Sequence, residues 1–208
     1  MAVCAEGGDA EAVRADLSTY AGTVDLASSV AALTENKLDI LVANAGISKG
    51  GSLEDHSEAD FDQLFATNVK SPFFLVTKLL PTLTSSASVV VLSSIAAHSF
   101  LGNPGQENVP TLPVYASTKG ALDTLVKHLA SILGPKGIRV NAVTPGIIET
   151  DMSNFTKSQF GREFAVSIQA LKRIGQAHDV ADVIAFLASN RARWITSASI
   201  PVDGGTRL

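Results

Sequence analysis

The sequence predicts an α/β domain in which an open parallel β-sheet carries helices on both faces. Short runs rich in Val, Ile and Leu are typical of strands that are covered on both sides. Three such runs occur, at Leu38–Ala43, Ala87–Leu92 and Gly137–Val143. Segments with helical periodicity separate them, and strands that alternate with helices of this length form βαβ units around a parallel sheet.

Composition supports one compact domain and excludes several kinds of partner. A chain of 208 residues with 46% hydrophobic and 17% charged residues can bury a large core, so global disorder is excluded. The net charge of −4 gives neither a nucleic acid nor an anionic membrane surface a basic patch to bind. No apolar stretch reaches the roughly 18 residues that a membrane span needs. A single Cys4 and an N-terminus without the features of a signal peptide predict a cytoplasmic protein.

The first predicted helical region follows the strand Leu38–Ala43. Ser57 is a suitable N-cap, and Pro72 is expected to kink the helix before Pro81 ends it. The apolar positions that recur at helical spacing on either side of the kink are Phe61, Leu64, Phe65, Val69, Leu75, Val76 and Leu79.

The strongest helical pattern lies between Val114 and Leu133, where apolar residues recur at three- and four-residue intervals until Gly134. A last helix is predicted at Asp179–Ala188, before a short strand near Ser199–Val202. Near the N-terminus, Val13–Leu17 is a candidate for one more strand.

Polar and small residues follow three of the predicted strands. They are Asn44-Ala45-Gly46, Ser93-Ser94 and Thr144-Pro145-Gly146. Any one of these sets is compatible with an ordinary turn. Because ligands bind outside the carboxyl ends of the strands in such sheets, three sets on one rim indicate a ligand site.

Tyr115 and Lys119 are the sharpest chemical signal. Four residues apart on a helix, the two side chains share a face, and an ammonium group beside a phenol should lower a pKa that starts near 10. Such a phenol can exchange a proton with a carbonyl or alcohol oxygen, and a hydroxyl from Ser94 would steady that oxygen. The four histidines show no spacing typical of metal ligands, so no metal site is predicted. His98 and Phe100 are candidates to line a substrate pocket.

These motifs together resemble the short-chain dehydrogenase/reductase family. The resemblance runs from about Asp16 to Gly205 and implies a doubly wound, Rossmann-type sheet. The matching segments, in the order of the family, are Asp16, Asn44-Ala45-Gly46, Asn68 within TNVKSPF, Ser94 within SSIAA, Tyr115-Ala-Ser-Thr-Lys119, the run Pro145–Thr150 and Val202-Asp203-Gly204-Gly205.

By this resemblance the chain transfers a hydride between NAD or NADP and a carbonyl or hydroxyl carbon of a small molecule. Tyr115 would be the proton donor and acceptor, and Lys119 would lower its pKa and hold the nicotinamide ribose. Ser94 would bind the substrate oxygen, and Asn68 would hold a water that relays protons to Lys119. The preference between NAD and NADP stays open.

The resemblance also implies which residues contact the cofactor and which segments build the assembly. The cofactor-binding residues would be Asp16, Leu17, Asn44, Ala45, Gly46, Tyr115, Lys119, Pro145, Gly146, Ile148 and Thr150. Residues 152–172 would cover the substrate. The helices that contain Asn68 and Tyr115 would pack across a dimer interface, and the last strand would help form a tetramer.

The sequence departs from the family pattern at its start, because it lacks the glycine-rich turn that cradles the pyrophosphate. We therefore expect residues 1–208 to form one domain of this family that is N-terminally truncated and lacks the first βαβ unit. Ser197 also stands where the family commonly has Gly.

Two alternatives stay open at this point. The first is a non-catalytic chain of the same family that acts as an assembly or binding protein. The second is a serine hydrolase, because Gly46–Gly50 matches the GxSxG nucleophile elbow and would make Ser48 the nucleophile.

Overall fold

A computed structural model describes residues 7–99 and 111–206. Its sheet has four parallel strands in sequential order: β1 (Leu38–Ala43), β2 (Leu83–Leu92), β3 (Arg139–Pro145) and β4 (Ser199–Val202). The predicted parallel α/β sheet is thus confirmed. Strand β2 begins earlier than the apolar run suggested, and β3 continues as far as Pro145.

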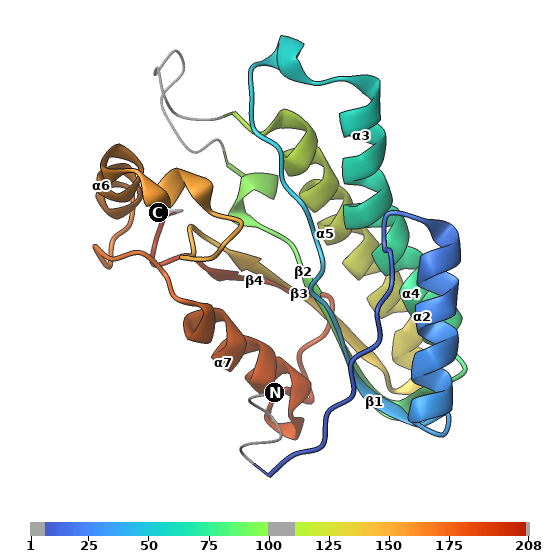
Figure 1. Cartoon of the computed structure of the whole chain (residues 1–208). Coiled ribbons are helices and arrows are strands. Elements are labelled where there is room, and N and C mark those ends of the chain that lie inside the picture. The colour runs from blue at the N-terminus through green and yellow to red at the C-terminus, as the bar shows by residue number, and fades with distance from the viewer. Residues whose placement is uncertain (1–6, 100–110, 207–208) are drawn as a thin grey trace.

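One face of the sheet is covered by α2 (Tyr20–Leu33), α4 (Ser71–Leu79) and α5 (Pro113–Leu133) (Figure 1). Buried residues of β2 and α5, among them Val89 and Val126, form the main core here. Helix α2 was not among the predicted elements. Its Thr23 and Ala27 are buried and Leu26 and Val30 pack against the core, but alanine and other apolar residues also occupy its outer faces, so the contrast between the faces is weak.

The opposite face is covered by α7 (Ala177–Ala188), whose Val180 and Leu187 pack against Val90 and Val143 of the sheet. Helices therefore cover both faces, as the sequence predicted. Strand β1 lies at one edge, and its Ile40 and Val42 are 47% and 37% exposed. The covering helix on this side thus does not extend over β1 (Figure 1).

The connection from β1 to β2 contains α3 (Glu58–Phe65), the π-helical turn η2 (Ala66–Lys70) and α4. Ser57 caps α3, as predicted, by accepting a hydrogen bond from the Asp60 backbone N–H. The predicted break at Pro72 lies earlier and takes the form of η2. The backbone stays right-handed helical through Phe65, Lys70 and Ser71, so the helix continues through η2 and Pro72 lies where α4 resumes the regular α-helical form.

The prediction of a strand at Val13–Leu17 was wrong, because this segment is an extended coil. A strand needs a neighbour to accept and donate its backbone hydrogen bonds, and in residues 7–99 and 111–206 the sheet pairs only β1 to β4. Asp16 instead turns the chain into α2, since its carboxylate accepts hydrogen bonds from the Ser18 backbone and hydroxyl.

The remaining elements are short. They are η1 (Leu53–Asp55), η3 (Ile95–Ala97), η4 (Gly134–Lys136), η5 (Asn154–Lys157), α6 (Gln159–Ser167) and η6 (Asn190–Ala192). Phe100, a sequence candidate for the substrate pocket, lies outside the described residues. A search of residues 7–99 and 111–206 finds no helix with the length and apolar character to cross a membrane.

Ser197 adopts a backbone φ of 65° just before β4. A side chain in this left-handed region costs about 1–2 kcal/mol, and glycine avoids most of that cost. Because the Ser197 N–H donates to Val140 O at 2.8 Å, the sheet holds the residue in this conformation.

We expect Ser197→Gly to raise the free energy of unfolding in urea by about 0.5–1 kcal/mol. Ser197→Ala, the control, keeps the Cβ and should show no gain; a glycine variant no more stable than the alanine variant would contradict this account.

Candidate active site

The strand ends bring the central candidates together at the carboxyl edge of the sheet. Ser94 follows β2 and starts the turn η3, while Tyr115 and Lys119 lie in the first turns of α5. The Lys119 Nζ atom lies over the Tyr115 ring, 5.5 Å from its centroid. The shared helix face that the spacing predicted is therefore present.

Tyr115 is partly buried, and the Ser94 side chain lies beside its phenol. Burial raises the pKa of the phenol from 10.0, and the polar interaction with Ser94 opposes this rise. The expected lowering of the Tyr115 pKa was wrong for the chain alone, because the loss of water around the phenolate outweighs the favourable contacts. The phenol is thus protonated at neutral pH, which is the form that can donate a proton.

Lys119 is only 4% exposed. Its Nζ donates a hydrogen bond of 2.7 Å to the Leu92 carbonyl oxygen, and its own carbonyl accepts one from the Ser93 hydroxyl. Burial lowers the pKa of the Lys119 ammonium from 10.5 to about 8, while the negative charge of Asp123 acts in the opposite direction. An ammonium group has three donors, and within residues 7–99 and 111–206 only the Leu92 carbonyl accepts from this one, which leaves donors for a ligand.

Asn68 is fully buried in the π-helical turn η2. Its amide donates to the Ile47 carbonyl at 2.9 Å and to the Thr118 hydroxyl at 3.0 Å, and its oxygen accepts from the Ile47 N–H at 2.9 Å. A short π-helical turn within a helix is frequent at functional sites. Asn68 therefore fixes the loop after β1 to α5, and Ile47 and Thr118 use both ends of its amide.

Gly46 lies between Asn68 and Lys119. A Cβ at this position would stand 3.3 Å from the Asn68 Oδ1 atom and 3.5 Å from the Lys119 Nζ atom. Asn44 and Ala45, which precede it, are exposed on the rim. A side chain here would therefore crowd the Asn68 amide oxygen and would stand in van der Waals contact with the Lys119 ammonium group.

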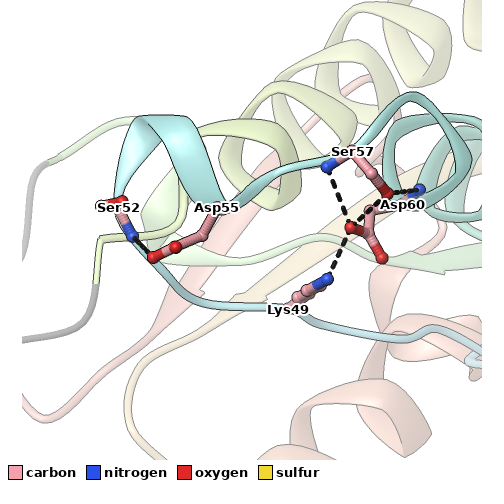
Figure 2. Close-up of polar contacts among 5 residues, drawn as sticks. All are labelled: Lys49, Ser52, Asp55, Ser57 and Asp60. Atoms are coloured by element: carbon pink, nitrogen blue, oxygen red, sulfur yellow. Dashed lines mark hydrogen bonds and ion pairs between the residues drawn. The ribbon is translucent and has the colours of Figure 1, made fainter.

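The same loop continues into a second set of polar contacts, which Figure 2 shows. Lys49 Nζ lies 2.5 Å from the Asp60 carboxylate, which also accepts hydrogen bonds from the Ser57 backbone and hydroxyl. The Ser52 backbone donates to Asp55 in the same way. These contacts fix the end of the loop to the start of α3.

The serine hydrolase alternative is not supported. A nucleophile elbow needs a helix that begins directly at the serine, whereas residues 44–52 are coil and α3 starts only at Glu58. Ser48 is exposed in this loop.

Four more of the expected cofactor-binding residues lie at the end of β3, which is Pro145, and in the loop that follows, which contains Gly146, Ile148 and Thr150. The backbone of this loop pairs with Gly175, which donates to the Ile147 carbonyl and accepts from the Glu149 N–H. The Glu149 side chain accepts from Arg162 on α6 at 2.6 Å and from Gln176 before α7 at 2.9 Å. Hydrogen bonds and the positive charge of Arg162 lower the pKa of Glu149. The loop is therefore fixed to both neighbouring helices.

Not every expected site residue joins this cluster. Asp16 is exposed in the turn before α2, where hydrogen bonds from Ser18 lower its pKa, and Leu17 is half-buried beside it. Sequence reasoning missed Asp123, which is buried on the inward side of α5, whereas Thr144 was among the polar residues expected on the rim and is buried. Asp123 had a detectable signal, since it is an acidic residue four positions after Lys119 on the same apolar stripe.

The residues present fit a nicotinamide cofactor. Along the carboxyl edge lie the buried Lys119 ammonium, the close approach that Gly46 allows, and the Thr144 hydroxyl, a buried group without a hydrogen-bond partner in the described part of the chain. Hydroxyl and amide groups of a ligand can satisfy such donors and acceptors.

A family model described as enoyl-(acyl carrier protein) reductase matches residues 1–207. The chain belongs to the short-chain dehydrogenase/reductase family. It is 35% identical to elsinochrome reductase 1 of Elsinoe fawcettii and covers 77% of that protein, with 98% of this chain matched. A 3-oxoacyl-[acyl-carrier-protein] reductase of Staphylococcus epidermidis is 37% identical over 81% of this chain and 66% of its own length.

Solved structures show the same fold. A blue fluorescent protein from a metagenomic library in complex with NADPH superposes with a TM-score of 0.87 at 30% identity, covering 98% of this chain and 78% of its own. An angucycline C-6 ketoreductase with bound NADP gives a TM-score of 0.87 at 31% identity, covering 97% of this chain and 77% of its own.

The buried Lys119 predicts a specific dependence of stability on pH. Its pKa of about 8 in the folded chain lies below the value of 10.5 for a free lysine, so between these values the unfolded chain binds a proton that the folded chain does not. The free energy of unfolding should therefore rise through this window, and the raised Tyr115 pKa should oppose the rise only above about pH 10.

From about pH 7.5 to about pH 9.5, we expect the wild-type chain to gain about 2 kcal/mol more than the Lys119→Met variant. Urea denaturation at a series of pH values measures both. Equal slopes for the two chains would show that Lys119 titrates like an exposed lysine.

Proposed function

We propose that this chain is a reductase that uses NADPH or NADH to convert a carbonyl group of a small molecule into an alcohol. The observation that carries the proposal is the juxtaposition of Tyr115, Ser94 and Lys119 at the carboxyl edge of the sheet. Family membership and neighbours crystallised with NADPH or NADP support the choice of cofactor. A cytoplasmic location is proposed with it, since reduced nicotinamide is the hydride source.

The protein's own groups supply binding, orientation and the proton. Ser94 donates a hydrogen bond to the substrate oxygen, and the Tyr115 phenol transfers its proton to that oxygen as negative charge develops there. The Lys119 ammonium stabilises the phenolate that remains and holds ribose hydroxyls with its free donors. Asn68 acts indirectly. By binding both Ile47 and Thr118, it keeps the loop after β1 against α5. The bound nicotinamide supplies the hydride.

Asp16, Leu17, Asn44, Ala45 and Gly46 are proposed for the adenosine side of the cofactor. The loop from Pro145 to Thr150 is proposed for the nicotinamide side. The support for this arrangement is their position at the ends of β1 and β3 and, for Asp16, the resemblance to the family alone.

Residues 152–172 are proposed to cover the substrate. They contain η5 and α6, in which Phe155, Phe160 and Phe164 pack together with centroid separations of 5.7–6.4 Å. Arg162 of α6 binds Glu149 in the loop proposed for the nicotinamide. This contact links the covering segment to the cofactor loop, so substrate and cofactor binding are expected to order the two together.

Tyr115→Phe tests the role of the phenol. It removes the transferable proton and keeps the ring, so we expect NADPH-dependent reduction to fall at least about 100-fold while cofactor affinity changes little. The assay follows oxidation of NADPH and of NADH with tetrahydroxynaphthalene and with a 3-oxoacyl-[acyl-carrier protein], the compounds that relatives' names give. Calorimetric titration with both cofactors is the control for binding. Undiminished turnover by the variant would remove Tyr115 from the mechanism.

We also propose that the chain forms a homodimer, or a tetramer built from such dimers, through the face made by α3, η2, α4 and α5. A groove of about 810 Å³ runs there between Phe65, Val69, Phe73 and Leu125. Phe73 is 40% exposed, and an apolar groove of this size is typical of an interaction surface.

Phe73→Asp tests the dimer, because a carboxylate buried in an apolar interface costs several kcal/mol. Light scattering coupled to size-exclusion chromatography should show dimers or tetramers for the wild-type chain and monomers for this variant. Leu53→Asp, a change at a 73% exposed residue on η1, should leave the assembly intact. A wild-type chain that is monomeric at micromolar concentration would refute the assembly proposal.

A further inference from the structure

A second buried charge lies beside the site. Asp123 is 4% exposed and follows Lys119 by four residues on the inward stripe of α5, so Tyr115, Lys119 and Asp123 occupy successive turns of one helix face. The mechanism described above assigns no role to this carboxylate.

Two side chains from other elements lie against the Asp123 carboxylate. Its Oδ1 atom accepts a hydrogen bond of 3.1 Å from the Ser199 hydroxyl on β4. Its Oδ2 atom lies 2.5 Å from His98 Nε2, at ion-pair distance but without the alignment of a hydrogen bond. His98 ends the turn η3 that Ser94 begins, and its side chain is one-third exposed.

A neutral amide could also accept the Ser199 hydroxyl, so that hydrogen bond alone does not require a carboxylate. The effect on the neighbouring Lys119 ammonium group, by contrast, requires the negative charge of a carboxylate. Burial favours neutral Lys119, and the Asp123 charge favours the protonated form. At distances of one helical turn inside a protein, an opposite charge is a strong influence on which form prevails.

We propose that Asp123 is a positioning residue that keeps Lys119 in its ammonium form, with His98 and Ser199 holding the carboxylate in place at the back of the site. The inference deepens the proposed reductase function and rests on it. Lys119 stabilises a phenolate on Tyr115 only as a cation, so Asp123 acts on the reaction through Lys119 without touching substrate or cofactor. The contact with His98 also joins the turn of Ser94 to α5.

The test measures the protonation of Lys119 directly in the full chain, by the ¹⁵N chemical shift of its side-chain amine as a function of pH. Lys119→Met identifies the signal by its loss. Asp123→Asn removes the charge at constant volume and should lower the titration midpoint by about one pH unit or more. Asp123→Glu retains the charge and should restore most of the midpoint. Ser199→Ala removes the hydrogen bond but not the charge, and should leave the midpoint near that of the wild type.

A surface variant keeps the proposal testable if Asp123→Asn does not fold. His98→Arg places a permanent cation next to Asp123 and should also lower the Lys119 midpoint, whereas the neutral control His98→Gln should not. Unchanged midpoints in both Asp123→Asn and His98→Arg would overturn the proposal. The titration needs neither cofactor nor turnover, so a wild-type chain that reduces no carbonyl would refute the reductase function without affecting this result.

Discussion

The burial of the Lys119 ammonium group is the constraint on which the site depends. A cation that is 4% exposed requires polar partners, and the structure provides the Leu92 carbonyl and the charge of Asp123. Both come from the elements that also position Ser94 and Tyr115, namely the end of β2 and helix α5. The same residues that make the buried charge tolerable therefore set the geometry of the proton donor.

Two irregular features hold the loop after β1 beside α5. The π-helical turn η2 places Asn68 in the interior, where its amide binds the backbone of Ile47 in both directions. Gly46 then passes close to Asn68 and Lys119 because it has no side chain.

The site and strand β1 differ in how far other elements cover them. Tyr115 and Lys119 lie on α5, which packs against the sheet, and Ser94 follows β2; the Lys119 ammonium also binds the Leu92 carbonyl at the end of that strand. Strand β1, by contrast, lies at a sheet edge, with Ile40 and Val42 exposed on one face. The proton-transfer chemistry expected of the family therefore depends on the part of the sheet that helices cover. Affinity for the adenosine half of a cofactor depends on what Asp16 and Asn44 contact.

The sequence by itself determined the elements whose patterns are local. The strands at β1 and β4, the long helix α5, the Ser57 cap and the pairing of Tyr115 with Lys119 follow from hydrophobic period and residue spacing, which need no tertiary information. Only the tertiary structure decided three further features. The Tyr115 pKa rises because of burial, Asn68 is used by Ile47 and Thr118, and Val13–Leu17 has no neighbouring strand. Each depends on which distant segments pack together and exclude water, and a local pattern contains no record of that.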